Sequence, residues 1–251
     1  MAKPIKRDDR DGVAVLTLDS APANMLTRAL RGALIDRIAD CAADDTVAAI
    51  VLRGAGQGFS GGLEFSDMET APESPSLSDL CRAVETCGKP VVAALHGRVL
   101  GGAVDLALAA HARVADDTAR LGYPDFSLGL LPSAGATQRL PRLIGAERTL
   151  DFIRSARLQR ASSEPLQGLF DRTVPEDGDL TGAAVALARD LAAHPDRLRR
   201  SCDRTDGFTD PAAFQAAISK ARHDLETRIQ PTERRLIDCV EASLIMPIEA
   251  G

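Results

Sequence analysis

A strand pattern, a pair of glycines and a helix pattern follow one another in the stretch Pro90-Val-Val-Ala-Ala-Leu-His-Gly-Arg-Val-Leu-Gly-Gly-Ala-Val-Asp-Leu-Ala-Leu108. Its first six residues form a short apolar run that is typical of a buried strand, and Gly101-Gly102 opens a small apolar helix over 103–110. The first N–H groups of such a helix are unpaired, so they can hold an anion. The two glycines also fit a crowded crossing that has no room for a side chain.

Strand and helix patterns alternate on both sides of this stretch. Apolar or alternating runs predict strands at 5–7, 13–18, 47–52, 90–95, 112–115 and 119–122. Helical spacing of apolar residues predicts helices at 27–43, 77–87, 103–110, 148–156, 180–193, 211–228 and 233–245. After Gly135 the pattern is helical only. The order predicts an α/β core followed by a C-terminal helical region, with a boundary near Pro195.

The composition indicates a folded protein that does not bind nucleic acid. The chain has 251 residues, of which 45% are hydrophobic and 26% are charged, so disorder is excluded. A net charge of -6 repels polyanions, and 3% aromatic residues offer few surfaces for stacking bases. Only four of the 30 cationic residues are lysines, so any phosphate or carboxylate site relies on arginine or backbone N–H groups.

The cysteines and the apolar runs bear on metal binding and location. The five cysteines are scattered and form no C-x-x-C pair, which favours neither a disulfide framework nor a zinc site. No apolar run approaches the roughly 18 residues of a membrane span, and residues 1–10 do not resemble a signal peptide. We therefore expect a cytoplasmic protein with no metal ion and no membrane partner.

Three motifs resemble the signature segments of the crotonase (enoyl-CoA hydratase/isomerase) superfamily. They are Gly58-Phe-Ser-Gly-Gly-Leu-Glu-Phe-Ser-Asp-Met68, the 96–108 part of the opening stretch, and Leu121-Gly-Tyr-Pro-Asp-Phe-Ser-Leu-Gly-Leu-Leu-Pro-Ser-Ala-Gly-Ala-Thr-Gln-Arg-Leu-Pro-Arg-Leu143. The residues in these motifs most resemble those of the hydratase portion of multifunctional β-oxidation enzymes. The resemblance implies an α/β spiral of ββα repeats over 1–195 and a C-terminal helical trimerisation region over 196–251.

The resemblance also implies a site for acyl-CoA thioesters. In this family two backbone N–H groups stabilise the enolate of the thioester, and they correspond here to Leu63 and Gly102. The residues that the resemblance places beside the substrate are Ser60, Gly61, Gly62, Gly101 and Pro132. Coenzyme A is part of the substrate, so the resemblance implies no separate cofactor. It also implies a homotrimer or a dimer of trimers.

Two glutamates of the hydratases correspond to Asp105 and Asp125, and this is the main departure from the family pattern. The pKa values of Asp and Glu differ by only about 0.4, so the acid/base chemistry is preserved. Each carboxylate is shorter by one carbon–carbon bond of about 1.5 Å, and a misplacement of roughly 1 Å can cost about 100-fold in rate. A second departure is Ser66, where relatives often carry a lysine near the CoA phosphates; Arg28 is a candidate replacement.

Several activities agree with this pattern. The first is a lyase reaction of fatty acid β-oxidation, the addition of water to a trans-2-enoyl-CoA to give the 3-hydroxyacyl-CoA. Δ3-Δ2-enoyl-CoA isomerisation is an alternative that a single carboxylate can perform. A non-catalytic acyl-CoA-binding subunit is another, because both expected glutamates are aspartates. Thioester hydrolysis and dehalogenation, in which an aspartate can be the nucleophile, also stay open.

Overall fold

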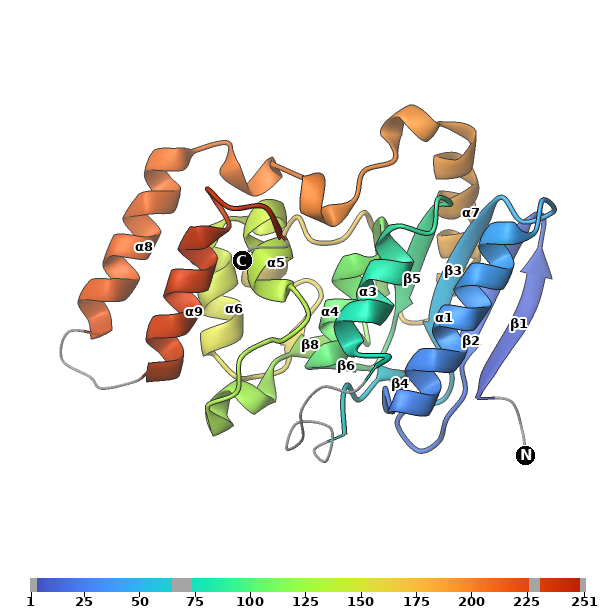
Figure 1. Cartoon of the computed structure of the whole chain (residues 1–251), viewed down its shortest axis with the longest axis horizontal. Helices are drawn as coiled ribbons and strands as arrows, with labels where there is room; N and C mark the ends of the chain where they lie inside the picture. Colours follow the sequence, from blue (N-terminus) through green and yellow to red (C-terminus); the bar gives the residue numbers. More distant parts are fainter. Residues whose placement is uncertain (1–3, 65–73, 226–230, 249–251) are drawn as a thin grey trace.

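Two β-sheets form the centre of the computed structural model, which describes residues 4–64, 74–225 and 231–248 (Figure 1). The larger sheet consists, in spatial order, of β1 Ile5–Arg10, β2 Val13–Leu18, β3 Ala49–Gly54, β5 Val91–Leu95, β7 Ala112–Asp116 and β10 Arg172–Val174. The smaller sheet consists of β4 Gly58–Ser60, β6 Arg98–Leu100, β8 Arg120–Gly122 and β9 Gln159–Arg160. Within these two sheets only the β1–β2 and β8–β9 pairs of the described strands are antiparallel.

Helices surround the two sheets. The α-helices are α1 Arg28–Ala43, α3 Leu77–Glu85, α4 Gly102–Ala109, α5 Ala136–Ile144, α6 Ala146–Arg154, α7 Leu180–Ala193, α8 Pro211–Leu225 and α9 Pro231–Ala242. The short 3-10 helices are η1 Pro124–Leu128, η2 Glu164–Leu166, η3 Pro195–Arg197, η4 Ser201–Asp203 and η5 Asp206–Phe208. Most of these bounds agree with the predicted ranges to within a few residues.

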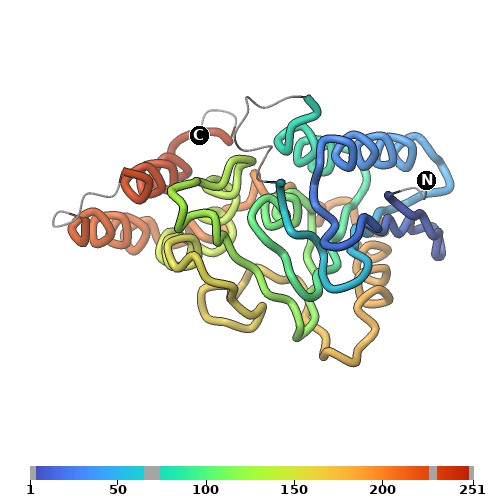
Figure 2. Tube along the Cα trace, turned by 90° about the horizontal axis from the view of Figure 1, so that it is seen from below, coloured from blue at the N-terminus to red at the C-terminus, as the bar shows by residue number. Residues whose placement is uncertain are grey.

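Both faces of the four inner strands of the larger sheet, β2, β3, β5 and β7, are buried, which explains why these strands are largely apolar runs. Alternate residues such as Val13 and Val15 face α7 in one apolar cluster. Their neighbours, such as Leu16, face α1 and α3 in the main core. Figures 1 and 2 show α1 and α7 on opposite sides of this sheet.

One unit of two strands and a helix recurs along the chain. Each unit gives one strand to the larger sheet, the next strand to the smaller sheet, and then a helix: β3-β4-α3, β5-β6-α4 and β7-β8-α5. Successive units stack through parallel pairing in both sheets. This spiral of ββα units is the predicted fold.

The prediction of helices alone after Gly135 was wrong at two strands. β10 pairs with β7 at the edge of the larger sheet, and β9 pairs with β8 in the smaller one. Both strands are very short, and their residues are half-buried or exposed, so they produce no apolar pattern. The division at residue 195 stays a prediction; α8 and α9, which follow it, pack against α5 and α6, which precede it (Figure 1).

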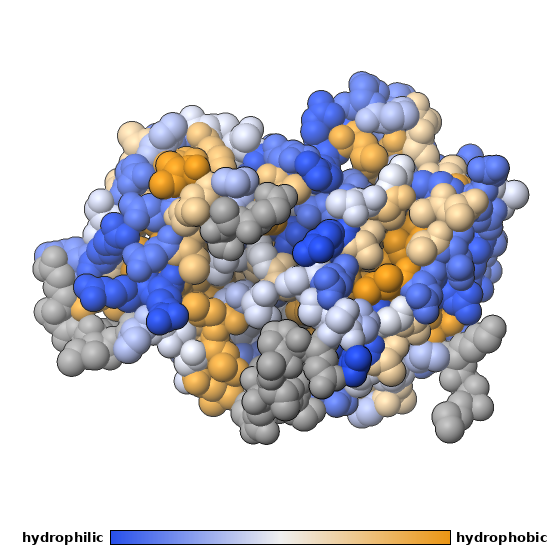
Figure 3. Space-filling view, viewed as in Figure 1, coloured by the Kyte–Doolittle hydropathy of each residue, from blue (hydrophilic) through white to orange (hydrophobic). Residues whose placement is uncertain are grey.

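The face seen in Figure 3 is mostly hydrophilic and carries separate apolar patches. One of them lies low in the view, over the turn that follows β8. Leu128, in this turn, is 66% exposed, and Ile245 after α9 is 80% exposed.

Candidate active site

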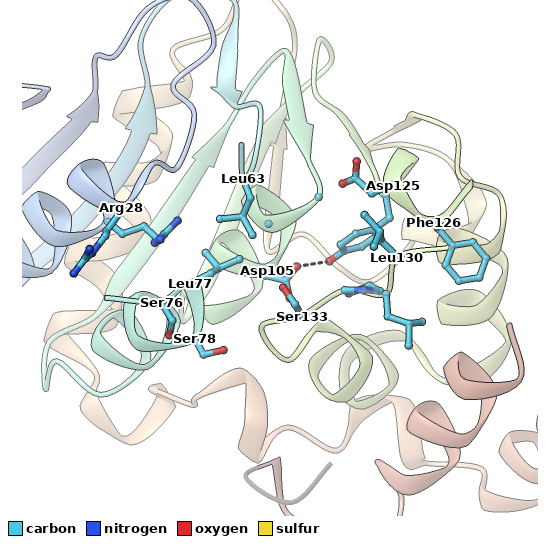
Figure 4. A pocket seen from close by; sticks show the side chains of 16 residues that line it. Arg28, Leu63, Ser76, Leu77, Ser78, Asp105, Asp125, Phe126, Leu130 and Ser133 are labelled. Carbon is cyan, nitrogen blue, oxygen red and sulfur yellow. Dashed lines mark hydrogen bonds between the residues drawn. The ribbon is translucent and has the colours of Figure 1, made fainter. Parts of the chain in front are cut away.

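A cavity of about 370 Å³ lies where α4 begins, and most of the predicted site residues line it. Its lining combines backbone of the glycine loops with carboxylate, hydroxyl, guanidinium and apolar side chains. Figure 4 shows Arg28, Ser76 and Ser78 at one end and Asp125 and Phe126 at the other, with Asp105 between them.

The loop after β4 and the start of α4 bring Leu63 and Gly102 together, as predicted. Gly62 has φ +84°, and a Cβ there would lie 2.3 Å from the carbonyl oxygen of Leu100 and 3.3 Å from the nitrogen of Gly102. In the part of the chain that the structure describes, neither the Leu63 N–H nor the Gly102 N–H donates a hydrogen bond to a protein acceptor. Two adjacent backbone N–H donors are therefore available at the N-terminus of α4.

Asp105 lies in the first turn of α4 and is only 1% exposed. Its Oδ1 accepts hydrogen bonds of 3.1 Å from both the Ala134 and the Ala136 N–H groups. Its Oδ2 accepts a 3.2 Å bond from the hydroxyl of Tyr123, drawn dashed in Figure 4. A carboxylate has about four acceptor positions, so about one remains for a ligand or water.

Burial is the dominant influence on the Asp105 carboxyl and raises its pKa to about 6. The backbone donors, Arg139 and Tyr123 oppose this shift because they favour the charged form. Arg139 also donates a 2.7 Å hydrogen bond to the Ala134 carbonyl and forms a buried ion pair with Glu85 at 2.8 Å. The segment that holds Asp105 is thus itself anchored to α5 and α3.

Asp125 belongs to η1 and is half-buried in the cavity wall. A Cβ at Gly101, where φ is +49°, would lie 2.8 Å from its Oδ2, so this carboxylate oxygen sits against the N-terminus of α4. Burial raises the pKa of Asp125 above its ordinary value. Two carboxyl groups from separate elements therefore line one cavity beside the two free N–H groups.

The other predicted residues divide into two groups. Gly101 and Pro132 line the cavity. Ser60 is buried outside the lining: its hydroxyl donates to the carbonyl of Asn24 at 2.7 Å and accepts the N–H of Gly62 at 3.1 Å. Gly61 donates its N–H to Ala23, so Ser60 and Gly61 hold the loop that carries Leu63.

The third motif contains Tyr123, but the sequence pattern predicts no role for it. The Tyr123 hydrogen bond to Asp105 connects the segment after β8 to α4. No local sequence pattern predicts this contact. Arg28, the candidate replacement for a lysine, does line the cavity, and Arg31 one helical turn later lines it as well. Ser66 lies outside the described residues.

The described ranges contain neither a metal-binding cluster nor a membrane-spanning helix. No group of three His, Cys, Asp or Glu side chains is placed to hold a metal ion within residues 4–64, 74–225 and 231–248. In the same part of the chain, no helix has the length and apolar character needed to cross a bilayer.

The fold and the cavity define a class of α/β spiral proteins in which paired backbone N–H groups meet carboxylates at a helix N-terminus. The family model described as enoyl-CoA hydratase/isomerase matches residues 8–233. The chain therefore belongs to the enoyl-CoA hydratase/isomerase family, a family of enzymes, and the resemblance of the three motifs is confirmed.

The curated relatives include a probable enoyl-CoA hydratase and multifunctional proteins. The peroxisomal fatty acid beta-oxidation multifunctional protein AIM1 of Arabidopsis thaliana is 35% identical over 240 residues, which cover 92% of this chain and 33% of that protein. A probable enoyl-CoA hydratase of Bacillus subtilis is 34% identical over 187 residues, 72% of each chain. The chain thus spans about one third of the multifunctional protein AIM1.

Solved structures share the fold over nearly the whole chain. DspI of Pseudomonas aeruginosa superposes with a TM-score of 0.69 at 26% identity and covers 96% of this chain and 97% of its own. An enoyl-CoA hydratase of Bacillus anthracis gives a TM-score of 0.69 at 25% identity, covering 97% and 91%. The ββα spiral is therefore the crotonase fold.

Proposed function

We propose that the protein adds water to the double bond of a trans-2-enoyl-CoA and forms the 3-hydroxyacyl-CoA. One observation supports this proposal above others: the Leu63 and Gly102 N–H groups lie together, without protein acceptors among the described residues, in a cavity that Asp105 and Asp125 also line. Water addition needs both an oxyanion site and acid/base groups, and the cavity offers both.

The two N–H groups have the role of an oxyanion hole in this proposal. When water attacks Cβ, negative charge develops on the thioester carbonyl oxygen, and two fixed donors stabilise it without reorganisation. Removing one donor of this kind typically costs about 3 kcal/mol in the transition state. Gly62 and Gly101 both have positive φ, which favours glycine, and a Cβ at Gly62 would also clash with the Leu100 carbonyl oxygen at 2.3 Å. Without side chains at these positions, the backbone can approach the thioester.

The carboxylates have the role of the acid/base pair. Asp125 is open to the cavity and sits against Gly101, so we assign it a direct proton transfer. Asp105 is held by three donors and has about one free acceptor position, so we assign it the orientation of the attacking water. Aspartate can fill the role of Asp105 because the water that it orients can span the missing methylene.

A Δ3-Δ2-enoyl-CoA isomerase is the second candidate, and the same geometry favours it. Isomerisation moves one proton between two carbons, which a single open carboxylate can do. Asp125 is half-buried and lines the cavity, whereas Asp105 is 1% exposed and already engaged by three donors. An unequal pair of this kind would serve a one-carboxylate reaction.

The test uses crotonyl-CoA and a 3-enoyl-CoA with the same purified protein. Hydration predicts loss of the ultraviolet absorbance of the conjugated enoyl thioester and formation of the 3-hydroxyacyl-CoA. Conversion of the 3-enoyl-CoA without hydration of crotonyl-CoA would favour the isomerase. Tight binding of both thioesters without turnover would contradict both activities and favour a binding subunit.

A further inference from the structure

Tyr123 lies in the cavity wall, and the proposed reaction gives it no role. Its side chain is 3% exposed, and its hydroxyl donates to Oδ2 of Asp105 at 3.2 Å. Its ring packs edge-on against Phe152 with centroids 5.7 Å apart and planes at 68°. Because the ring is buried and packed against Phe152, the hydroxyl has a fixed position.

The hydroxyl completes a set of donors around one carboxylate. Ala134 and Ala136 fix Oδ1 from one side, and they leave the second oxygen free to turn. Tyr123 supplies the donor for that second oxygen. Charge-assisted hydrogen bonds from three fixed donors restrict both the position and the rotation of the carboxylate.

We propose that Tyr123 is a positioning residue, whose hydroxyl holds the Asp105 carboxylate in one orientation toward the cavity. Its effect on turnover rests on the proposed function, but the contact itself does not. The shorter aspartate has to present its free acceptor position at a defined place, because a displacement of roughly 1 Å can cost about 100-fold in rate. Tyr123 and the two N–H groups define that place together.

Two other groups face Asp105 and Tyr123 from packed helices, Cys81 on α3 and Arg139 on α5. Burial raises the pKa of the Cys81 thiol, and the Glu85 partner keeps Arg139 charged. Burial also raises the pKa of Tyr123 itself, with a further contribution from Asp105. Near the Asp105 pKa of about 6, Asp105 is therefore the group in this set that changes charge.

The fluorescence of Tyr123 can report this contact without a label. The chain has one tyrosine and no tryptophan, so emission excited in the phenol band comes from Tyr123 alone. A phenol that donates to a carboxylate emits weakly, because the carboxylate accepts its proton in the excited state. We expect the emission of the free protein to rise as the pH falls through about 6, where Asp105 becomes protonated.

Matched variants assign this transition. Asp105→Asn should abolish it, Asp125→Asn should retain it, and Tyr123→Phe supplies the blank. An emission that is flat through this pH range, or that titrates equally in Asp105→Asn, would overturn the proposal. No substrate is needed, so this arm decides the contact even if the protein hydrates no enoyl-CoA or if Tyr123→Phe fails to fold.

The kinetic arm tests the effect on turnover in Tyr123→Phe, which keeps the ring and removes the hydroxyl. We expect kcat to fall about 10- to 100-fold with KM changed much less. The acid limb of the pH–rate profile should move to higher pH, because the carboxylate loses a donor that favours its charged form. Unchanged kcat and an unchanged acid limb would show that the hydroxyl positions nothing that catalysis uses.

Discussion

Asp105 carries a cost to stability that its burial explains. Its pKa rises from the ordinary 3.8 to about 6 in the folded protein, so the folded state binds this proton more tightly than the unfolded state. The resulting stabilisation is complete below pH 3.8 and is lost as the pH rises through about 6. Above that pH the protein contains a buried charge that it would be more stable without.

Asp105→Asn removes the charge and keeps a side-chain oxygen for the Ala134 and Ala136 N–H groups. We expect its free energy of unfolding at pH 8 to exceed that of the wild type by about 3 kcal/mol, and most of this gain to be lost near pH 4. Urea unfolding at the two pH values measures it. An equal loss of stability at both values would contradict this explanation.

Asp125 supports the opposite expectation, a loss of activity without a loss of stability. Asp125→Asn alters a half-buried side chain at the cavity mouth, so the free energy of unfolding should change by less than about 0.5 kcal/mol. Hydration of crotonyl-CoA should fall by about 100-fold or more, because a positioned acid/base group is removed. Asp117→Asn, on an exposed loop residue, is the control; equal activities of the two variants would refute the role of Asp125.

At the scale of elements, the approach of the β4 loop to α4 defines the oxyanion site. Gly62 and Gly56 both have positive φ, +84° and +74°, so alanine is strained at either position. Only at Gly62 would the new Cβ clash, at 2.3 Å from the Leu100 carbonyl; at Gly56 nothing lies within 4 Å. Alanine substitutions at Gly56 and Gly62 therefore distinguish the effect of backbone strain, which both share, from the effect of the clash, which only Gly62→Ala produces.

We therefore expect Gly62→Ala to separate the two N–H groups and to lower kcat for crotonyl-CoA by about 100-fold. Gly56→Ala should lose a similar increment of stability to strain but keep near-normal kcat. Thermal melts of both variants measure the loss of stability, and steady-state kinetics measure kcat. Similar kcat values would mean that the closeness of the two loops is not needed.

The elements differ in how well the sequence predicted them. The start of α1 was predictable because Thr27 caps it, accepting the Leu30 N–H at 3.2 Å. β6 and β10 were not predicted, because three residues are too few to show a period. Likewise, the motifs predicted Leu63, Gly102 and both aspartates in one cavity. They did not predict the role of Tyr123, because its contact with Asp105 depends on how the segment after β8 packs against α4.

At the scale of the whole molecule, the helical region is the part that we expect to contact other copies of the chain. Charged residues join α8 to α9, through Arg222 with Asp238 and Glu241. Apolar side chains remain exposed nearby in sequence, including Ile245 after α9, and Leu128 is exposed in the turn after β8. Isolated apolar residues are normal on a surface, so their number alone does not establish an interface.

The resemblance to the family nevertheless gives a definite expectation, a homotrimer. Sedimentation of the purified protein should give three times the mass of the single chain, or six times that mass for a dimer of trimers. A monomer that hydrates crotonyl-CoA at a normal rate would contradict this prediction and would leave the catalytic account intact.

The proposed reaction adds water to an enoyl thioester in the cavity that Asp105 and Asp125 line. The most direct measurement incubates crotonyl-CoA with the protein in water enriched in oxygen-18 and analyses the product by mass spectrometry. We predict a 3-hydroxyacyl-CoA that carries the heavy oxygen, with formation strongly reduced in Asp125→Asn. Crotonyl-CoA that stays unlabelled and unconsumed, at the level of the buffer blank, would contradict the account.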